Sequence, residues 1–263
     1  MSAGVETPEG LASVLSRLRT KEQVEGVLAV GSLVSNTLTP ASDYDLVIVL
    51  KGVERAWYVG VTAIDDRFTD LLFVSANALR QIRALASPLA TGHELAPVIH
   101  WFERGAILFD AGGQLAAAQR HVRQRALVQP IADDAAYGAW FAVNYNLAVA
   151  DRLCRSTDAR YQAMADIRMA VYGHSDLWFN YFTIRCIPWH GDKAAVQYLA
   201  RHDPDYLTLY RRLIETTDRP ARLACYRRAA ARVTAPLGGL WSWPPDVTNI
   251  QSPPQTWADL LDG

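Results

Sequence analysis

Apolar positions in the first half of the chain alternate between helical spacing and short buried runs. Thr7 and Pro8 precede a stripe of apolar residues at helical spacing, which predicts a helix over residues 8–20. Runs rich in apolar and β-branched residues predict strands over residues 24–30, 44–50 and 68–74. A shorter candidate strand over residues 106–109 ends at the turn signal Asp110-Ala-Gly-Gly113.

The second half of the chain has a different pattern. From Asp133 onward, aromatic and aliphatic residues keep helical spacing through residues 137–153 and 161–182, and further helices are predicted over residues 193–200, 204–216 and 220–233. The tail from Pro236 holds Trp241, Trp243 and two Pro-Pro pairs, which favours an irregular wrap. We therefore predict an α+β domain over residues 1–125 and an all-helical domain over residues 126–263.

Composition changes this picture mainly by exclusion. The chain has 263 residues, half of them apolar by type, with 26 basic and 27 acidic side chains. Such a chain can bury a real core, and its near-neutral charge argues against a nucleic-acid binder that depends on phosphate neutralisation. Three cysteines without a CxxC pair, together with no signal-like or membrane-spanning stretch, predict a cytoplasmic protein with reduced thiols.

The segment with the most chemical information begins where the first strand ends. Gly31-Ser32 at that point leaves the backbone free to approach a bulky anion, and the turn can offer N–H groups and a hydroxyl to phosphate oxygens. Asp43 and Asp45 stand two residues apart at the head of the next strand, so both carboxylates project from one face. Paired carboxylates of this kind suit a Mg²⁺ ion that also binds nucleotide phosphates.

A third acid, Asp70, lies inside the apolar run 68–74, where a carboxylate is expensive to bury without a cation or a partner. Asp65 and Asp66 stand just upstream and are the alternative source of this acid if the strand begins earlier. Because Asp70 has apolar neighbours on both sides, we favour Asp70.

These residues resemble a known family. Gly31-Ser32, Asp43-x-Asp45 and the strand-embedded Asp70 are similar to the nucleotidyltransferase superfamily of the DNA polymerase β type, and most of all to the bacterial aminoglycoside and lincosamide nucleotidyltransferases. The stretch Gly105–Asp110 with its Gly-Gly turn resembles the last strand of that catalytic domain. Trp189-His-Gly-Asp-Lys193 is similar to a segment in which streptomycin-type adenylyltransferases carry a lysine that contacts the nucleotide.

The resemblance implies a fold and a reaction. The fold would be α+β, a nucleotidyltransferase domain with a mixed β-sheet flanked by helices, followed by an all-helical C-terminal bundle. The reaction would move AMP from ATP onto a hydroxyl of a small molecule, such as an aminoglycoside-like antibiotic, and would thereby confer resistance. Asp43, Asp45 and Asp70 would be the catalytic acids and the Mg²⁺ ligands, with Asp70 alternatively the general base. Gly31, Ser32 and Lys193 would bind the nucleotide, and the family also allows a homodimer.

Other readings of the same residues stay open. The acceptor could be a protein side chain or an RNA end, although the neutral charge disfavours nucleic acid, and a non-catalytic nucleotide-binding or antitoxin-like protein would keep the same fold. Asp151, Asp166 and Asp176 could meet a cationic acceptor or could simply form a solvated helix face. Zinc, P-loop and Rossmann sites are not expected, because the six histidines and the glycines lack the required spacings.

Overall fold

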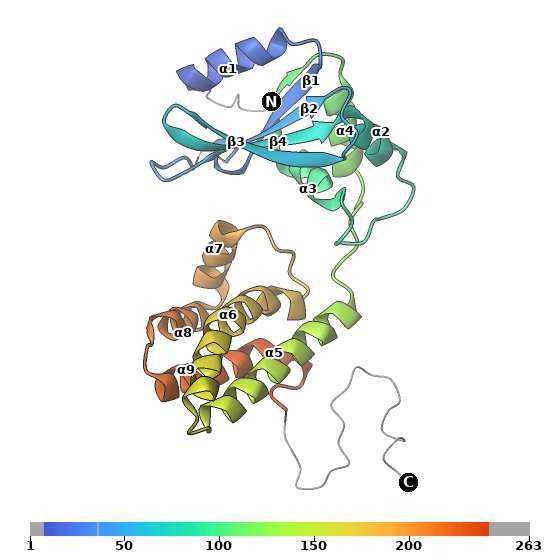
Figure 1. Cartoon of the computed structure of the whole chain (residues 1–263). Helices are drawn as coiled ribbons and strands as arrows, with labels where there is room; N and C mark the ends of the chain where they lie inside the picture. The colour runs from blue at the N-terminus through green and yellow to red at the C-terminus, as the bar shows by residue number, and fades with distance from the viewer. Residues whose placement is uncertain (1–7, 36, 242–263) are drawn as a thin grey trace. The chain divides into compact units, whose positions relative to one another are not determined.

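The computed structural model describes residues 8–35 and 37–241, and the chain folds into two compact units, Met1–Gln129 and Pro130–Gly263 (Figure 1). The first unit combines a sheet with helices, and the second is helical. The boundary that the sequence predicts, between residues 125 and 126, remains a prediction about independently folding domains.

The described part of the first unit contains a five-stranded mixed sheet with the strand order β3-β4-β2-β1-β5. Its strands are β1 (Val24–Val30), β2 (Tyr44–Leu50), β3 (Trp57–Ile64), β4 (Arg67–Ser75) and β5 (Ala106–Asp110). Strands β2 and β4 run parallel, whereas the β1–β2, β1–β5 and β3–β4 pairs are antiparallel. The mixed sheet that the sequence predicts is therefore confirmed, and β3 is an additional edge strand.

Helices cover both faces of this sheet (Figure 1). Helix α1 (Glu9–Arg19) packs Leu11 and Leu15 against one face, together with the even-numbered Leu46 and Ile48 of β2. The odd-numbered Val47 and Val49 point to the other face. There they pack with the helices α2 (Ala76–Ala84), α3 (Ala96–Arg104) and α4 (Gln114–Arg123).

The β3–β4 hairpin also secures α1. Asp65 and Asp66, with φ of 52° and 56°, form a two-residue connection of the type I′ class between Ile64 and Arg67. The Asp65 carboxylate accepts hydrogen bonds from the backbone N–H of Gly10 at 2.8 Å and of Leu11 at 3.1 Å. The first turn of α1 is thus capped by a residue far away in sequence. The helix that the sequence predicts from residue 8 begins one residue later, at Glu9, because Pro8 occupies the N-cap position.

The second unit is a bundle of helices, which confirms the helical half. Its helices are α5 (Asp133–Cys154), α6 (Ala159–Ile184), α7 (Asp192–His202), α8 (Pro204–Glu215) and α9 (Arg219–Thr234). Aspartate side chains cap α6, α8 and α9 by accepting backbone N–H bonds at their first turns. The bundle is centred on fully buried side chains such as Val143, Met169, Leu177, Tyr206 and Tyr226.

The chain beyond the bundle is described only as far as Trp241. A short 3₁₀ turn, Ala235–Leu237, follows α9, and the Trp241 ring then packs edge-on against Trp140 and Phe141 of α5. The predicted irregular tail with Trp243 and its two Pro-Pro pairs lies outside the described residues. Among the described helices, none has the length and apolar character needed to cross a bilayer.

Candidate functional site

Three aspartates come together at the beginnings of β2 and β4. Asp45 and Asp70 are directly paired in the parallel register of these strands, so their side chains leave the same face of the sheet side by side. Asp43 precedes Asp45 by two residues and projects to that face as well. One carboxylate oxygen from each of the three residues lies within 4.8 Å of the others.

This face of the sheet changes character along its strands. Val47, Val49 and Val74 are fully buried beneath the helices, whereas Asp45 and Asp70 are half-buried and Asp43 is exposed. The carboxylates therefore form the solvent-reaching end of an otherwise apolar face. A ligand can approach them from one side while the core holds their backbones in place.

Gly31 fits closely against this acidic cluster. It begins the 3₁₀ turn Gly31–Leu33 after β1 and has a φ of 66°, a conformation that favours glycine. A Cβ at this position would overlap the Oδ2 atom of Asp45. The site thus requires glycine twice, once for the backbone turn and once for the space that the Asp45 carboxylate occupies.

Ser32 lies beside the same cluster but is itself buried, with 6% of its surface exposed. Its hydroxyl donates a long hydrogen bond of 3.4 Å to the backbone carbonyl of Asp43. In the structure, Ser32 therefore links the turn after β1 to the start of β2. Its expected contact with a nucleotide phosphate stays a prediction.

The loop before Asp43 is braced by a residue that the sequence did not single out. Arg67, the first residue of β4, donates hydrogen bonds to the backbone carbonyls of Thr39 and Ser42, the latter at 2.9 Å. The Ser42 hydroxyl in turn accepts from the backbone N–H of Thr39 at 2.9 Å. Because Arg67 lies far from this loop in sequence, no local sequence pattern predicts the contact.

The alternative acids Asp65 and Asp66 do not join the cluster. Asp65 caps α1 and accepts a further 3.4 Å hydrogen bond from the hydroxyl of Tyr44. Burial, and then the negative charge of Asp65, raise the pKa of Tyr44. Among the described residues, Asp43, Asp45 and Asp70 are the one group of three acidic, histidine or cysteine side chains close enough to share a metal ion.

The donor set of this cluster fits a hard divalent cation. Three carboxylates within a few ångströms repel one another, and a divalent cation between them removes that repulsion. Oxygen ligands suit Mg²⁺ or Mn²⁺, whereas a zinc site normally includes histidine or cysteine. The space that Gly31 leaves beside Asp45 keeps that carboxylate free of steric overlap, so the residues fit the ion that the sequence predicts.

Lys193 belongs to the helical unit, where it is exposed at the second position of α7. The segment around it is firmly held: the indole N–H of Trp178 donates to Asp192 at 2.9 Å, and the Trp189 ring packs against Phe179 and Phe182. The expected contact between Lys193 and a nucleotide stays a prediction.

The acids of the helical unit are largely engaged by neighbouring side chains. Asp151 pairs with Arg155 and Arg227. Asp166 accepts two hydrogen bonds from Arg219, at 2.9 and 2.7 Å, and these bonds lower its pKa. Asp176 is half-buried and accepts a hydrogen bond from Asn146, and burial raises its pKa. Each of these three acids therefore already has a side-chain partner, although the Asp166 side chain remains 39% exposed.

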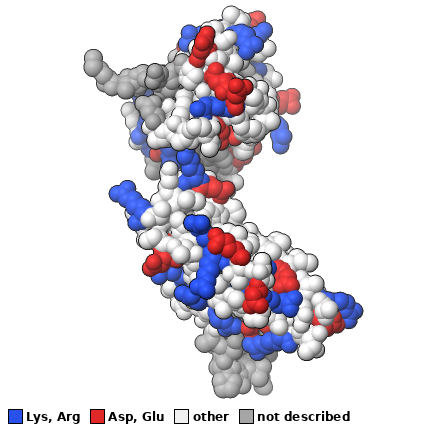
Figure 2. All heavy atoms as spheres, turned by 90° about the vertical axis from the view of Figure 1, so that its left-hand side faces the viewer, with Lys and Arg blue, Asp and Glu red and all other residues white. Residues whose placement is uncertain are grey.

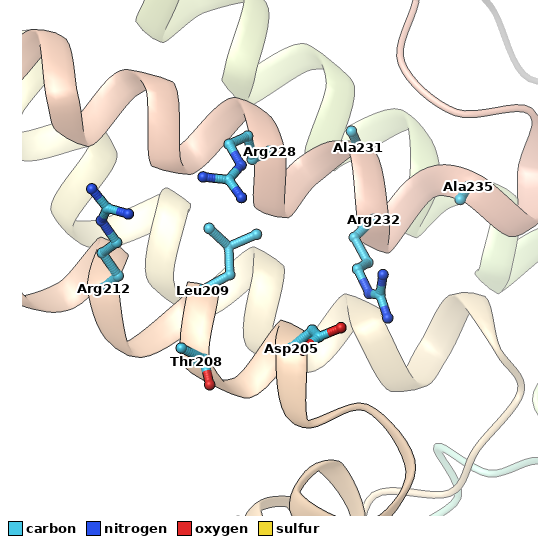
Figure 3. A pocket seen from close by; sticks show the side chains of 8 residues that line it. All are labelled: Asp205, Thr208, Leu209, Arg212, Arg228, Ala231, Arg232 and Ala235. Atoms are coloured by element: carbon cyan, nitrogen blue, oxygen red, sulfur yellow. The ribbon is translucent and has the colours of Figure 1, made fainter.

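A hollow of about 730 Å³ lies between α8 and α9 (Figure 3). Figure 3 shows Arg228 above Leu209 and Arg212 to one side of it, while Arg232, from the next turn of α9, reaches toward α8. Arg232 is already committed to Asp203, which accepts from its guanidinium at 2.7 and 3.0 Å. A hollow rimmed by arginines is unsuited to a cationic molecule.

On the face drawn in Figure 2, the charged side chains of the described residues do not form a basic band of the kind that binds a nucleic-acid backbone. Over the described residues of that face, basic and acidic side chains are interspersed on both units instead of forming a continuous basic band. This pattern agrees with the near-neutral composition of the chain.

One family model matches the part of the chain that contains the candidate site. Residues 11–91 match the family model described as the nucleotidyltransferase domain, and this segment carries Gly31, Ser32 and all three aspartates. A solved structure of a nucleotidyltransferase-like protein from Exiguobacterium sibiricum 255-15 is similar to this chain with a TM-score of 0.41 and 14% sequence identity, over 86% of this chain and 74% of that one. No curated protein matches the chain.

Proposed function

We propose that this chain is a Mg²⁺-dependent nucleotidyltransferase that moves AMP from ATP to a hydroxyl of a small molecule. The observation that carries this proposal is the meeting of Asp43, Asp45 and Asp70 within 4.8 Å, inside the segment that matches the nucleotidyltransferase domain. We place the reaction in the cytoplasm, where ATP and Mg²⁺ are supplied.

The proposed reaction is a single in-line displacement at the α-phosphorus of ATP. A bond forms between the acceptor oxygen and the α-phosphorus, and the bond from that phosphorus to the bridging oxygen of the β-phosphate breaks. Pyrophosphate leaves with the electron pair, and the hydroxyl proton passes to the Asp70 carboxylate or to water. Mg²⁺ held by the aspartates would supply stabilisation of the negative charge that develops on the phosphate oxygens.

The order of the strands suggests a direction for this reaction across the sheet. Val30 pairs with Asp45, Asp45 with Asp70, and Asp70 with Val61 of the edge strand β3. The turn at Gly31 therefore lies on one side of the acids and β3 on the other. We place the nucleotide phosphates toward Gly31 and the acceptor toward Asp70 and β3.

The acceptor side of the sheet has an apolar character. Val59 and Val61 project from the same face as Asp70, and 51% and 62% of their surfaces are exposed. An acceptor bound there would contact apolar carbon next to the reacting hydroxyl. An aminoglycoside-like antibiotic, and with it a role in resistance, remains our proposal for the acceptor class; a protein side chain and an RNA end are the alternatives.

Substitution of one cluster acid tests the proposal. Asp45→Asn removes a charge without changing side-chain shape, whereas Asp66→Asn makes the same change in a turn outside the cluster, where asparagine tolerates the positive φ. Purified variants are offered ATP, Mg²⁺ and a panel of aminoglycosides, lincosamides and hydroxyl-bearing cell metabolites, and pyrophosphate release is measured. We expect turnover in the wild type and in Asp66→Asn but not in Asp45→Asn.

Two results of this assay would count against the proposal. Unchanged turnover in Asp45→Asn would exclude the metal-dependent chemistry described above. Tight ATP binding by calorimetry without pyrophosphate release from any acceptor would favour the non-catalytic, nucleotide-binding alternative.

Lys193→Ala tests the proposed lysine contact in the same assay. Because Lys193 is exposed, the substitution should leave thermal stability unchanged while raising the KM for ATP. An unchanged KM would remove Lys193 from the nucleotide site.

A further inference from the structure

The helices α8 and α9 are basic although the chain as a whole is nearly neutral. Residues 204–234, which span both helices, contain seven arginines and three acidic residues, whereas the whole chain has 26 basic and 27 acidic side chains. The seven arginines are Arg211, Arg212, Arg219, Arg222, Arg227, Arg228 and Arg232. Neighbouring charges of one sign repel each other, so the partners of these side chains are informative.

Five of the seven arginines have a partner within the chain. The partners are Glu215 for Arg211, Asp166 for Arg219, the backbone carbonyl of Thr216 for Arg222, Asp151 for Arg227 and Asp203 for Arg232. The two remaining arginines are Arg212 and Arg228, whose guanidinium groups form no hydrogen bond or ion pair with the described part of the chain. Both of them line the hollow between α8 and α9.

The hollow brings these two side chains together from different helices. Arg212 comes from α8 and Arg228 from α9, and Figure 3 shows them around the side chain of Leu209. Both arginines are exposed, whereas Leu209 and Ala231 are partly buried and give the hollow an apolar wall. This end of the hollow therefore presents two guanidinium groups next to apolar carbon.

The acidic residue that lines the hollow lies at its other end. Asp205 precedes Arg212 by seven residues, which is about 10 Å along α8. Hydrogen bonding to Asp203, and then the negative charges of Asp203 and Asp205, raise the pKa of Arg232. The charges at that end are thus balanced by one another, and the uncompensated positive charge of the hollow is that of Arg212 and Arg228.

Two guanidinium groups on facing helices suit a phosphate group. Each guanidinium can donate two parallel hydrogen bonds to phosphate oxygens, and a doubly charged phosphate balances both positive charges. A phosphate ion would fill only a small part of the hollow, whose volume of about 730 Å³ is typical of a small-molecule site. The apolar wall at Leu209 and Ala231 would contact the rest of a larger ligand.

We propose that the hollow between α8 and α9 binds a phosphate monoester with an apolar body, whose phosphate lies between Arg212 and Arg228 and whose body packs on Leu209 and Ala231. The site belongs to the helical unit alone, so it stands independently of nucleotidyl transfer at the three aspartates.

Calorimetric titration with phenyl phosphate tests this site. The titration is run in EDTA without added metal, so that metal-dependent binding at the three aspartates does not contribute. Inorganic phosphate and phenol serve as the two halves of the probe. We expect the wild type to bind phenyl phosphate about tenfold more tightly than either half, because only the whole probe meets both the guanidinium groups and the apolar wall.

Substitution of single arginines shows where the probe binds. Arg212→Gln and Arg228→Gln should each weaken the binding of phenyl phosphate by about tenfold or more, because each removes hydrogen bonds to a charged group. The matched control is Arg211→Gln, which removes the same charge from the adjacent residue of α8, where the side chain pairs with Glu215 outside the hollow. The control should bind as the wild type does. Since Arg212 and Arg228 are exposed, the melting temperatures of the unliganded variants should equal that of the wild type.

Four results would overturn the proposal. A wild type that does not bind phenyl phosphate would exclude the site. Equal weakening in Arg211→Gln would mean that the overall basic charge of α8 and α9, and not the hollow, attracts the probe. Inorganic phosphate that binds as tightly as phenyl phosphate would exclude the apolar contact. Loss of binding in Asp45→Asn, with binding retained in Arg212→Gln and Arg228→Gln, would place the probe at the acidic cluster instead.

Discussion

Replacing Gly31 with alanine should separate the requirement for backbone conformation from the requirement for space beside Asp45. Gly31 has a φ of 66°, and a Cβ there would overlap the carboxylate of Asp45. Gly52 provides a matched control, because its φ is 71° and a Cβ at that position would meet no atom within 4 Å. Both substitutions force alanine into the left-handed region, but only Gly31→Ala displaces a proposed metal ligand.

The structure sets the expected magnitudes. Alanine in the left-handed region costs about 1–2 kcal/mol, so both variants should lose about that much unfolding free energy. Gly31→Ala should lose about 1 kcal/mol more, because the Asp45 side chain must leave its favoured rotamer or the turn must shift. A misplaced ligand commonly reduces metal affinity by about 10- to 100-fold, and we expect a loss of that size for Gly31→Ala alone.

Two measurements on the purified variants report their stability and their metal affinity. Urea unfolding gives the stability of each variant, and titration with Mn²⁺, monitored by electron paramagnetic resonance of the free ion, gives metal affinity without any need for an acceptor. Wild-type Mn²⁺ affinity in Gly31→Ala would refute the assignment of Asp45 as a ligand held in place by the glycine. A loss of affinity in Gly52→Ala equal to that in Gly31→Ala would mean that backbone strain, and not the contact with Asp45, causes the effect.

Two further predictions concern stability. Asp65→Gly keeps the turn conformation but removes the cap of α1, so it should lower the unfolding free energy by about 1 kcal/mol. Asp66→Gly, in the same turn, should leave the unfolding free energy unchanged. Equal effects of the two substitutions in urea unfolding would exclude the cap as the cause. Burial raises the pKa of Asp203, but hydrogen bonds from Arg232 and Tyr181 outweigh it and hold that pKa below its ordinary value of 3.8. Because the pKa of Asp203 is lower in the folded than in the unfolded chain, the carboxylate stabilises the fold above about pH 4, and this contribution is lost as the pH falls further. The free energy of unfolding in urea should therefore fall more steeply below about pH 4 in the wild type than in Asp203→Asn.

Most of the sheet could be predicted because its central strands are simple in sequence. Val24–Val30 and Tyr44–Leu50 are buried nearly throughout, so they read as continuous apolar runs, and the structure has both strands with those bounds. Strand β3 was not assigned, because as an edge strand it is exposed on both faces and has neither a buried run nor a clean alternation. The helices α2, α3 and α4, of nine, nine and ten residues, were also not assigned, although their buried residues recur at helical spacing.

The three aspartates could be found from sequence because each is a charged residue at the start of, or inside, an otherwise apolar strand. Asp43 and Asp45 head an apolar strand, and Asp70 interrupts another, where an unpaired carboxylate is costly. The sequence could not show which groups the other acids meet. The pairing of Asp166 with Arg219 and of Asp203 with Arg232 joins residues that are distant along the chain, and only the packing of the helices brings them together.

The β3–β4 hairpin connects the fold of the first unit to its candidate site. Its tight turn fixes the register in which Arg67 faces Ile64 and Asp70 faces Val61, and the parallel pairing of β4 with β2 then sets Asp70 beside Asp45. The same turn presents Asp65 to α1 on the opposite face of the sheet, and Arg67, the next strand residue, braces the loop that leads to Asp43. A slip of one residue in this hairpin would turn Asp70 toward the α1 face and separate it from the other two acids, so the geometry of the site depends on a turn that contributes no ligand.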